Sequence, residues 1–124
     1  MPTRTGRTKS TVKEGTFKKR LIRALEQIPN SSWIVTEAGS VRGHADIKGS
    51  INGYAVSLEV KRCKAESRRQ TGRTVLQRYK LQQAREAGEY ANWCYPENLE
   101  ETLADLRHFN SLLRASPLFS LPDL

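Results

Sequence analysis

Long apolar runs are absent from this sequence. No stretch approaches the roughly 20 apolar residues that a bilayer-spanning helix needs, so we exclude a membrane span. Residues 1–10 contain basic side chains but lack the hydrophobic stretch of a secretory signal, so we expect no export. Only two cysteines are present, Cys63 and Cys94, and neither has partners at zinc-finger spacing. We therefore expect free thiols in a reducing cytosol.

The 124 residues contain no internal repeat or low-complexity block, and the length suits one domain. We assign residues 11–114 to this domain, with a basic tail at 1–10 and a C-terminal tail at 115–124. A domain of this size can fold without disulfides or structural metals.

The net charge of +8 is distributed unevenly along the chain. Residues 61–80 carry eight basic side chains and one acidic side chain, whereas residues 81–124 are acidic overall. A concentrated positive field favours binding to a polyanion, above all nucleic acid, over the alternative of a solvated face that only aids solubility. The basic residues of this segment are Lys61, Arg62, Lys64, Arg68, Arg69, Arg73, Arg78 and Lys80.

The N-terminal part of the domain predicts a helix followed by a strand. The sequence of residues 11–14, Thr-Val-Lys-Glu, matches a capping box, and Pro29 ends the run that follows. Residues 33–36 have the β-branched and aromatic composition of a strand, and a glycine-containing loop follows. The apolar stripe of the helix consists of Phe17, Leu21, Leu25 and Ile28.

Residues 46–61 predict a β-hairpin. Asn52-Gly53 is a strong signal for a type I′ turn, which needs positive φ at both central residues. With these two residues as the loop, Asp46 lies directly opposite Glu59. By the period of two, Val56, Leu58 and Val60 share an apolar face with Tyr54, while Ala55, Ser57, Glu59 and Lys61 share the other.

The remaining segments complete an alternating pattern. Residues 62–73 are basic and aperiodic and predict a mobile loop, and residues 74–77 form a second capping-box pattern that opens a helix ending near Gly88. Residues 91–95 predict a strand, and Pro96 begins a last helix. Its stripe consists of Leu99, Leu103, Leu106, Phe109 and Leu113. The prediction is an α/β fold in the order αβββαβα, with helices flanking a mixed four-stranded sheet.

Asp46, Glu59 and Lys61 form the set of residues that carries chemistry. Two carboxylates facing each other on a sheet repel, and a divalent cation offsets that repulsion. Mg²⁺ prefers one or two carboxylates together with waters and phosphate oxygens. The ammonium of Lys61 then lies where it can stabilise an attacking hydroxide or the charge on a phosphate. The alternative is an ordinary polar strand face, with Asp46 as a turn residue.

The pattern resembles the PD-(D/E)XK nuclease superfamily and, more narrowly, the VRR-NUC family. Asp46, twelve intervening residues and then Glu59-Val60-Lys61 match its acid and Glu-Val-Lys strand. Gln77 precedes Ala87-Gly88 at the family's interval, and Glu14 stands in the first helix. Ala45 occupies the family's proline position, which contributes no ligand. The resemblance covers about residues 11–106.

The resemblance implies that Asp46, Glu59 and the main-chain carbonyl of Val60 bind Mg²⁺ or Mn²⁺. Glu14 would complete the site, or alternatively cap the first helix with Thr11. Glu37 is a further candidate acid.

The resemblance also implies roles for residues around the metal. Lys61 would act on the nucleophilic water or the scissile phosphate, and Gln77 would orient Lys61 or contact the phosphate, against a simple capping role. The basic residues of 62–80 would follow the DNA backbone. We interpret His44 as an exposed loop residue, with contact to substrate or metal as the alternative, and His108 as a surface residue.

The implied function is a Mg²⁺-dependent DNA endonuclease that cuts branched DNA, either Holliday junctions or flaps, and needs no small-molecule cofactor. Small members of the family resemble junction-resolving enzymes that act as homodimers, and they look like bacterial or bacteriophage proteins acting in the cytoplasm. No added module that reads bases is visible. Two alternatives remain, a non-catalytic nucleic-acid-binding module and a sequence-specific restriction-type endonuclease.

Overall fold

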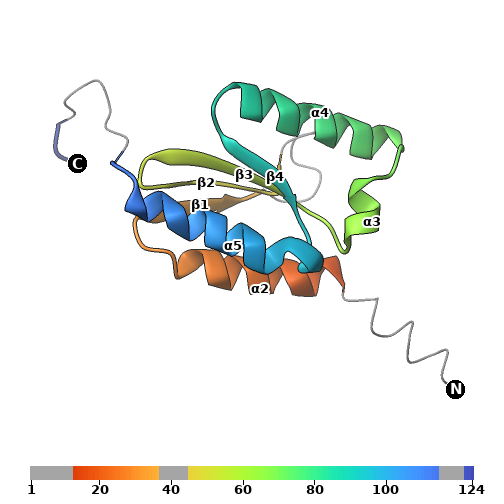
Figure 1. The fold of residues 1–124 in the computed structure, drawn as a ribbon, viewed down its shortest axis with the longest axis horizontal. Coiled ribbons are helices and arrows are strands. Elements are labelled where there is room, and N and C mark those ends of the chain that lie inside the picture. The colour runs from red at the N-terminus through yellow and green to blue at the C-terminus, as the bar shows by residue number, and fades with distance from the viewer. Residues whose placement is uncertain (1–12, 37–44, 115–121) are drawn as a thin grey trace, which may run out of the picture.

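A four-stranded sheet lies between helices on both of its faces in the computed structural model, which describes residues 13–36, 45–114 and 122–124 (Figure 1). The strand order is β1-β2-β3-β4, with antiparallel β1–β2 and β2–β3 pairs and a parallel β3–β4 pair. The predicted α/β class with a mixed four-stranded sheet is therefore confirmed. The strands are β1 (Ser31–Val35), β2 (Ile47–Ile51), β3 (Tyr54–Val60) and β4 (Tyr90–Cys94).

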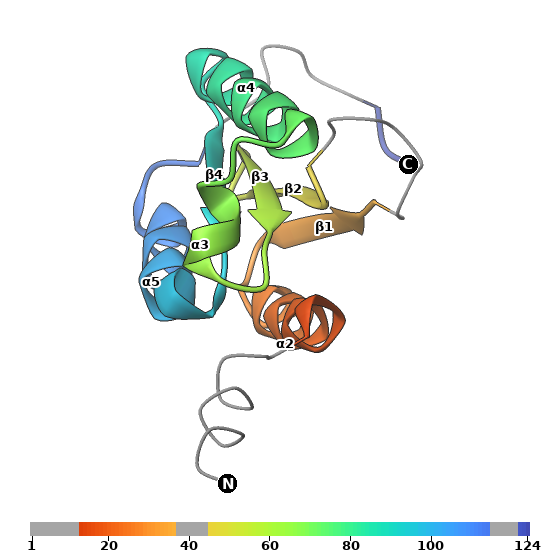
Figure 2. The same ribbon diagram turned by 90° about the vertical axis from the view of Figure 1, so that its right-hand side faces the viewer.

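The helices form two layers around this sheet. Helices α2 (Glu14–Glu26) and α5 (Leu99–His108) cover one face, and α4 (Gly72–Glu86) covers the other (Figure 2). The main hydrophobic core lies on the α2 and α5 side, where apolar side chains of both helices meet those of β2, β3 and β4. Burial of this apolar surface supplies most of the drive to fold.

Helix α2 forms because its apolar residues recur every four positions. Phe17, Leu21 and Leu25 are all buried, as the predicted stripe requires, and Ile28 is buried just after the helix. The chain then turns through Asn30, whose φ is 57°. The indole N–H of Trp33 donates to the carbonyl of Leu25 at 3.1 Å and so satisfies a carbonyl at the end of the helix.

The β2–β3 hairpin has the predicted turn and register. Asn52 and Gly53 have φ values of 54° and 88°, as a type I′ turn demands. Ile51 pairs with Tyr54 and Ile47 with Leu58. The Asn52 side chain also donates to the carbonyls of Phe109 (2.9 Å) and Leu112 (3.0 Å), which ties the turn to the segment after α5.

Strand β3 is buried on both faces, and this places Glu59 in the interior. Val56, Leu58 and Val60 belong to the main core. Ser57 and Glu59 alternate with them and therefore point to the α4 side, where they are 2% and 3% exposed. Burial of a carboxylate requires compensation by hydrogen bonds or charge.

The prediction of a loop over residues 62–73 is wrong in part. Residues Lys64–Ser67 form the short helix α3, and α4 begins at Gly72, three residues earlier than a cap at Thr74 predicts. The cap of α4 is Thr71, whose hydroxyl accepts from the Thr74 N–H at 3.4 Å, so the predicted capping box at Thr74 is also wrong. Contacts of Glu66 with the arginines around it order a segment that shows no periodicity in the sequence.

The two ends of α5 and the start of α2 also differ from the prediction. Helix α5 begins at Leu99 after a 3₁₀ turn (Pro96–Asn98), and it is followed by a second 3₁₀ turn (Phe109–Ser111). Leu113 lies beyond the helix and is 89% exposed, so it does not belong to the stripe. Helix α2 begins at Glu14 with Lys13 as its cap, which places Glu14 one position into the helix and not at the third position that a capping box requires.

The structure bears on the expectations about membrane spans and cysteines for the described residues. None of the helices in this part of the chain has the length and apolar character that crossing a bilayer demands. Cys63 and Cys94 are free thiols, as expected, and burial raises the pKa of the Cys94 thiol to about 12. The predicted tail at 1–10, most of the predicted tail at 115–124, and the loop with Gly39 and Gly43 lie outside the described residues.

Gly49→Ala should destabilise the protein by about 1–3 kcal/mol or more, because the position has no room for a side chain. Gly49 pairs with Trp33 across the β1–β2 ladder. A Cβ atom there would clash with the Ser32 carbonyl oxygen and approach the Trp33 ring to 2.5 Å. Urea denaturation monitored by circular dichroism measures the loss. Gly15→Ala is the control, since nothing lies near a Cβ at that position, and equal stability of the two variants would contradict the prediction.

Candidate active site

Asp46 and Glu59 come together at the end of the hairpin away from its turn. Asp46 immediately precedes β2, and its Oδ2 accepts from the Val60 N–H at 2.9 Å. The main-chain carbonyl of Asp46 accepts from the Thr36 N–H at 2.8 Å, which continues the β1–β2 pairing. Asp46 is thus held by both neighbouring strands, and its carboxylate lies beside the end of β3. The hairpin register delivers the juxtaposition that the sequence predicted.

Both acids line one strongly polar cavity of about 260 Å³. The residues to which the sequence analysis assigned metal-binding or catalytic roles line it: Glu14, Asp46, Glu59, Val60, Lys61 and Gln77. The rest of the lining comes from α3, α4 and the turn between them: Glu66, Arg69, Thr71, Arg73 and Thr74. The cavity therefore combines carboxylates at its floor with cationic side chains.

The surroundings of the Glu59 carboxyl group disfavour its ionised form. Its pKa is raised to about 9, first by burial, then by a hydrogen bond with the Asp46 side chain and by the charges of Asp46 and Glu14, and Lys61 opposes this rise. The Nε2 of Gln77 donates to Glu59 Oε2 at 3.0 Å. The hydrogen bond from Gln77 and the nearby Lys61 ammonium do not offset the effect of burial. The acid therefore stays protonated at neutral pH unless another cation joins the site.

Glu14 belongs to this site and does not cap α2. Its carboxyl group lines the cavity from the first turn of the helix. Partial burial, followed by the charge of Asp46, raises the pKa of Glu14, and Lys61 lowers it. The capping interpretation is wrong because Lys13 is the residue before the helix and makes no side-chain cap; Thr11 itself lies outside the described residues.

Lys61 extends the β3–β4 ladder by one residue beyond the strand, and its side chain lines the cavity. Its backbone N–H donates to the Cys94 carbonyl at 2.9 Å. Its Nζ lies over the ring of Trp93, 5.5 Å from the ring centroid, in a cation–π contact. The same ammonium lowers the pKa of both Glu14 and Glu59, so its charge acts on both carboxyl groups.

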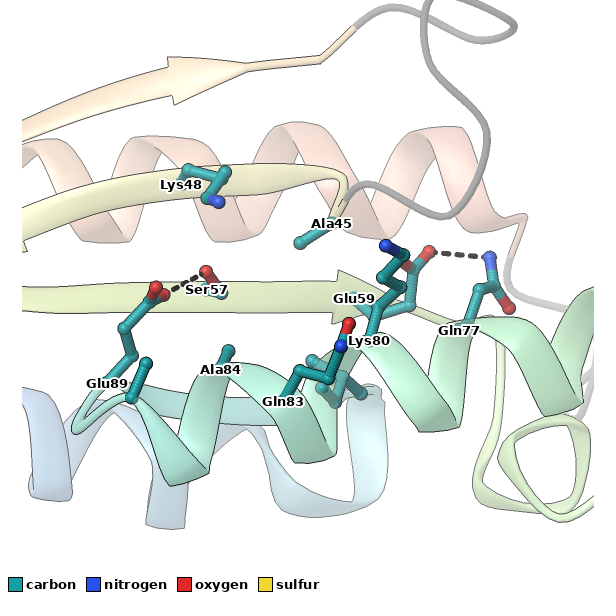
Figure 3. A pocket seen from close by; sticks show the side chains of 11 residues that line it. Ala45, Lys48, Ser57, Glu59, Gln77, Lys80, Gln83, Ala84 and Glu89 are labelled. Atoms are coloured by element: carbon teal, nitrogen blue, oxygen red, sulfur yellow. Dashed lines mark hydrogen bonds between the residues drawn. The ribbon is translucent and has the colours of Figure 1, made fainter.

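Gln77 contacts the acid, whereas the sequence predicted a contact with Lys61, the phosphate or the helix cap. The residue is only 6% exposed on the face of α4 that packs on β3. Figure 3 shows its amide pointing to the Glu59 carboxyl group, with the hydrogen bond drawn as a dashed line. Its Oε1 is buried without a hydrogen-bond partner among the described residues. An amide oxygen in that position is free to accept from a water or a bound group.

Two site residues escaped the sequence analysis. Lys18 Nζ lies 3.7 Å from Asp46 Oδ1, and its position four residues after Glu14 on α2 was an available signal. Glu66 lines the cavity, accepts from the Arg62 N–H at 3.2 Å and pairs with the Arg62 guanidinium at 2.8 Å. No comparable signal marks Glu66 in the sequence, because the helix that places it has no periodic pattern.

The predicted DNA-binding residues separate into groups in the structure. Arg69 and Arg73 line the active-site cavity. Arg68 and Arg78 line a second groove beside it, and Lys80 lines a third cavity of about 270 Å³ between the hairpin and α4 (Figure 3). Arg62 is engaged by Glu66, and Lys64 is exposed on α3. The basic segment therefore surrounds the carboxylates and does not form one uniform stripe.

The other candidate residues either lie outside the described residues or, among the described ones, do not line this cavity. Glu37 and His44 lie outside the described residues, as does Gly43. Ala45 borders the third cavity. His108 is exposed, and its ring is within hydrogen-bond distance of the Ser111 hydroxyl, which agrees with a surface role.

No family model, curated protein or solved structure matches this chain. The site must therefore be judged by its own chemistry. Within residues 13–36, 45–114 and 122–124, no three His, Cys, Asp or Glu side chains are grouped closely enough to hold a metal ion by themselves. The available donors are two carboxylates, Asp46 and Glu59, with Glu14 and the main chain at Val60 in the same cavity. Hard oxygen donors of this kind suit Mg²⁺ or Mn²⁺, which keep several water ligands.

Proposed function

We propose that this chain is a metal-dependent endonuclease that hydrolyses phosphodiester bonds of branched DNA, such as Holliday junctions or flaps. The observation that carries the proposal is Glu59: a buried acid that faces a second carboxylate and lies at the floor of a cavity containing Lys61, Arg69 and Arg73. Such a site needs a cation and attracts a phosphate. The resemblance of Asp46 and Glu59-Val60-Lys61 to the VRR-NUC pattern points the same way.

Asp46, Glu59 and the main-chain carbonyl of Val60 would hold Mg²⁺ or Mn²⁺, with Glu14 on the same side. When bound, the ion supplies an activated water and neutralises charge that develops on the phosphate. The buried, proton-binding state of Glu59 fits this assignment, because a divalent ion replaces the proton and relieves the repulsion between the acids. No small-molecule cofactor is required.

The surrounding side chains divide the remaining tasks. The Lys61 ammonium donates to the attacking water or to a nonbridging phosphate oxygen, and Arg69 and Arg73 hold the adjacent phosphates. Gln77 acts as a positioning residue because it fixes one oxygen of Glu59. The water gives up a proton to solvent as its oxygen bonds to phosphorus. The bond from phosphorus to the leaving sugar oxygen breaks, and that sugar oxygen takes up a proton from solvent, so that one water is consumed.

We further propose that the protein works as a homodimer in the cytoplasm of a bacterium or a phage-infected cell, since resolving a junction requires two cuts. The rival is a non-catalytic nucleic-acid-binding module. One observation favours this rival: both oxygens of Asp46 already have neighbours, the Val60 N–H at 2.9 Å and the Lys18 ammonium at 3.7 Å. A sequence-specific restriction-type endonuclease is the further alternative.

One panel of end-labelled DNA tests these possibilities. We expect cleavage of a four-way junction or a flap in Mg²⁺ or Mn²⁺, little cleavage of linear duplex or single strand, and none in EDTA. Binding without cleavage of any DNA form would favour the non-catalytic module. Cleavage of linear duplex at discrete sites would favour the restriction-type enzyme. Sedimentation of the protein with and without junction DNA measures its oligomeric state.

A further inference from the structure

A groove of about 500 Å³ lies beside the candidate active site and combines two aromatic rings with two guanidinium groups. Trp93 and Tyr95 come from the end of β4 and the residue after it, and alternate positions of an extended chain face the same side. The opposite wall comes from α3, α4 and the segment between them: Ser67, Arg68, Gln70 and Arg78.

The groove and the active site are neighbours through the parallel β3–β4 pair. Glu59 pairs with Trp93 in the register of these strands, which places their main chains about one strand spacing apart, roughly 4.8 Å, with both side chains on the same face of the sheet. The Lys61 ammonium lies over the Trp93 ring and links the two regions. A ligand that occupies the groove is therefore close to a phosphate held at Glu59 and Lys61.

Several hydrogen bonds hold the groove in place. The Arg78 guanidinium donates to the carbonyls of Ser67 (3.0 Å) and Arg69 (3.1 Å), which joins α4 to the end of α3. The Asn98 side chain accepts from the Tyr95 N–H at 2.9 Å and donates to the Trp93 carbonyl at 3.1 Å. Both walls are thus fixed by main-chain contacts, and the rings are presented without a loop having to order first.

We propose that this groove binds an unpaired nucleotide of the DNA substrate, with its base stacked on Trp93 and Tyr95 and its phosphate at Arg68. The inference rests on the proposed function and adds a feature that a phosphate-binding surface alone does not require. Aromatic faces stack on any base that has left the duplex, whereas bases within a duplex are already covered by their neighbours. Arginine supplies the phosphate contact and can also stack. Flapped DNA offers such a nucleotide at its branch point.

The first test uses the unaltered chain in EDTA, so that no cleavage occurs. Fluorescence anisotropy compares a labelled twelve-residue oligothymidylate with an abasic oligonucleotide of the same length, since the two carry the same phosphates. We expect the oligothymidylate to bind about tenfold more tightly or better. Equal affinities would overturn the inference, because charge alone would then account for binding.

The second test locates the contact. In the Trp33→Phe variant Trp93 is the single indole, and stacking of a base should quench its emission; binding without quenching would contradict a base on Trp93. Trp93→Leu should abolish the preference for the oligothymidylate over the abasic strand, and Trp93→Phe should retain part of it. Tyr79→Leu is the matched control, since Tyr79 is an exposed aromatic residue of α4 outside the groove.

These outcomes separate the two proposals. A protein that cuts none of the DNA forms but prefers the oligothymidylate would contradict the nuclease and keep the groove. A protein that cuts branched DNA but binds both oligonucleotides equally would keep the nuclease and contradict the groove.

Discussion

Glu59→Gln should reduce Mg²⁺-dependent DNA cleavage by more than about 100-fold while DNA binding stays equal or becomes tighter. Loss of even an outer partner of a metal site costs about 10–100-fold, and Glu59 is proposed as a direct ligand. Glutamine keeps the size of the side chain and an oxygen that accepts from Gln77, but it removes the negative charge. The same loss of charge reduces repulsion of a phosphate in the cavity. Initial cleavage rates and anisotropy titrations on a junction or flap measure both effects.

The matched control is Glu89→Gln, which makes the same change of charge in the neighbouring cavity. Glu89 accepts from the Ser57 hydroxyl at 2.6 Å and does not line the active-site cavity (Figure 3). Its cleavage rate should remain close to that of the unaltered protein. Cleavage by Glu59→Gln at an undiminished rate would remove Glu59 from the mechanism.

The metal-free protein should lose stability as the pH rises from about 4.5 to about 9. The pKa of Glu59 is 4.5 in an ordinary environment and is raised to about 9 in the folded protein by burial and by Asp46. Between these values the folded state keeps a proton that the unfolded state has released. The stabilisation is therefore complete below pH 4.5 and disappears as the pH passes 9, with a slope approaching about 1 kcal/mol per pH unit inside the window.

Thermal unfolding in EDTA at pH 6 and pH 9 measures this loss. Glu59→Gln mimics the protonated acid, so it should show a shallower pH dependence and exceed the unaltered protein in stability at pH 9. A residual slope of the same sign is expected from Glu14, whose pKa is also raised. Mg²⁺ should restore stability to the unaltered protein at pH 9, because it binds the ionised acid. Identical pH dependence in the two proteins would show that Glu59 ionises freely in the folded state.

The turn residues and the alternation of side chains along a strand were sufficient to predict the hairpin and the pairing of the two acids. The conformation of Asn52 and Gly53 follows from the residues themselves, and a two-residue turn fixes every pairing along the two strands. The position of Asp46 beside the end of β3 is a consequence of that register. Likewise, the spacing of Phe17, Leu21 and Leu25 identified the buried face of α2 without knowledge of its partner.

Contacts between distant segments could not be predicted in the same way. Helix α3 is ordered by Glu66 and its arginine partners, and none of them forms a periodic pattern. The cap of α4 is Thr71, three residues before the predicted cap at Thr74. Gln77 is therefore not the third residue of the helix, and a capping role does not apply to it. The hydrogen bond from Gln77 to Glu59 spans 18 residues and depends on how α4 packs against β3. The groove at Trp93 and Tyr95 likewise depends on α3 and α4 facing the end of β4.

The contacts of the hairpin turn have a consequence for when the protein is completed during its synthesis. Asn52 binds the carbonyls of Phe109 and Leu112, and the Tyr54 hydroxyl donates to the carbonyl of Leu113 at 2.7 Å. These partners are made long after the hairpin itself as the ribosome proceeds from the N-terminus. A nascent chain that already carries Asp46 and Glu59 therefore lacks these hydrogen bonds at the turn, the opposite end of the hairpin from the two acids, until residue 113 has emerged.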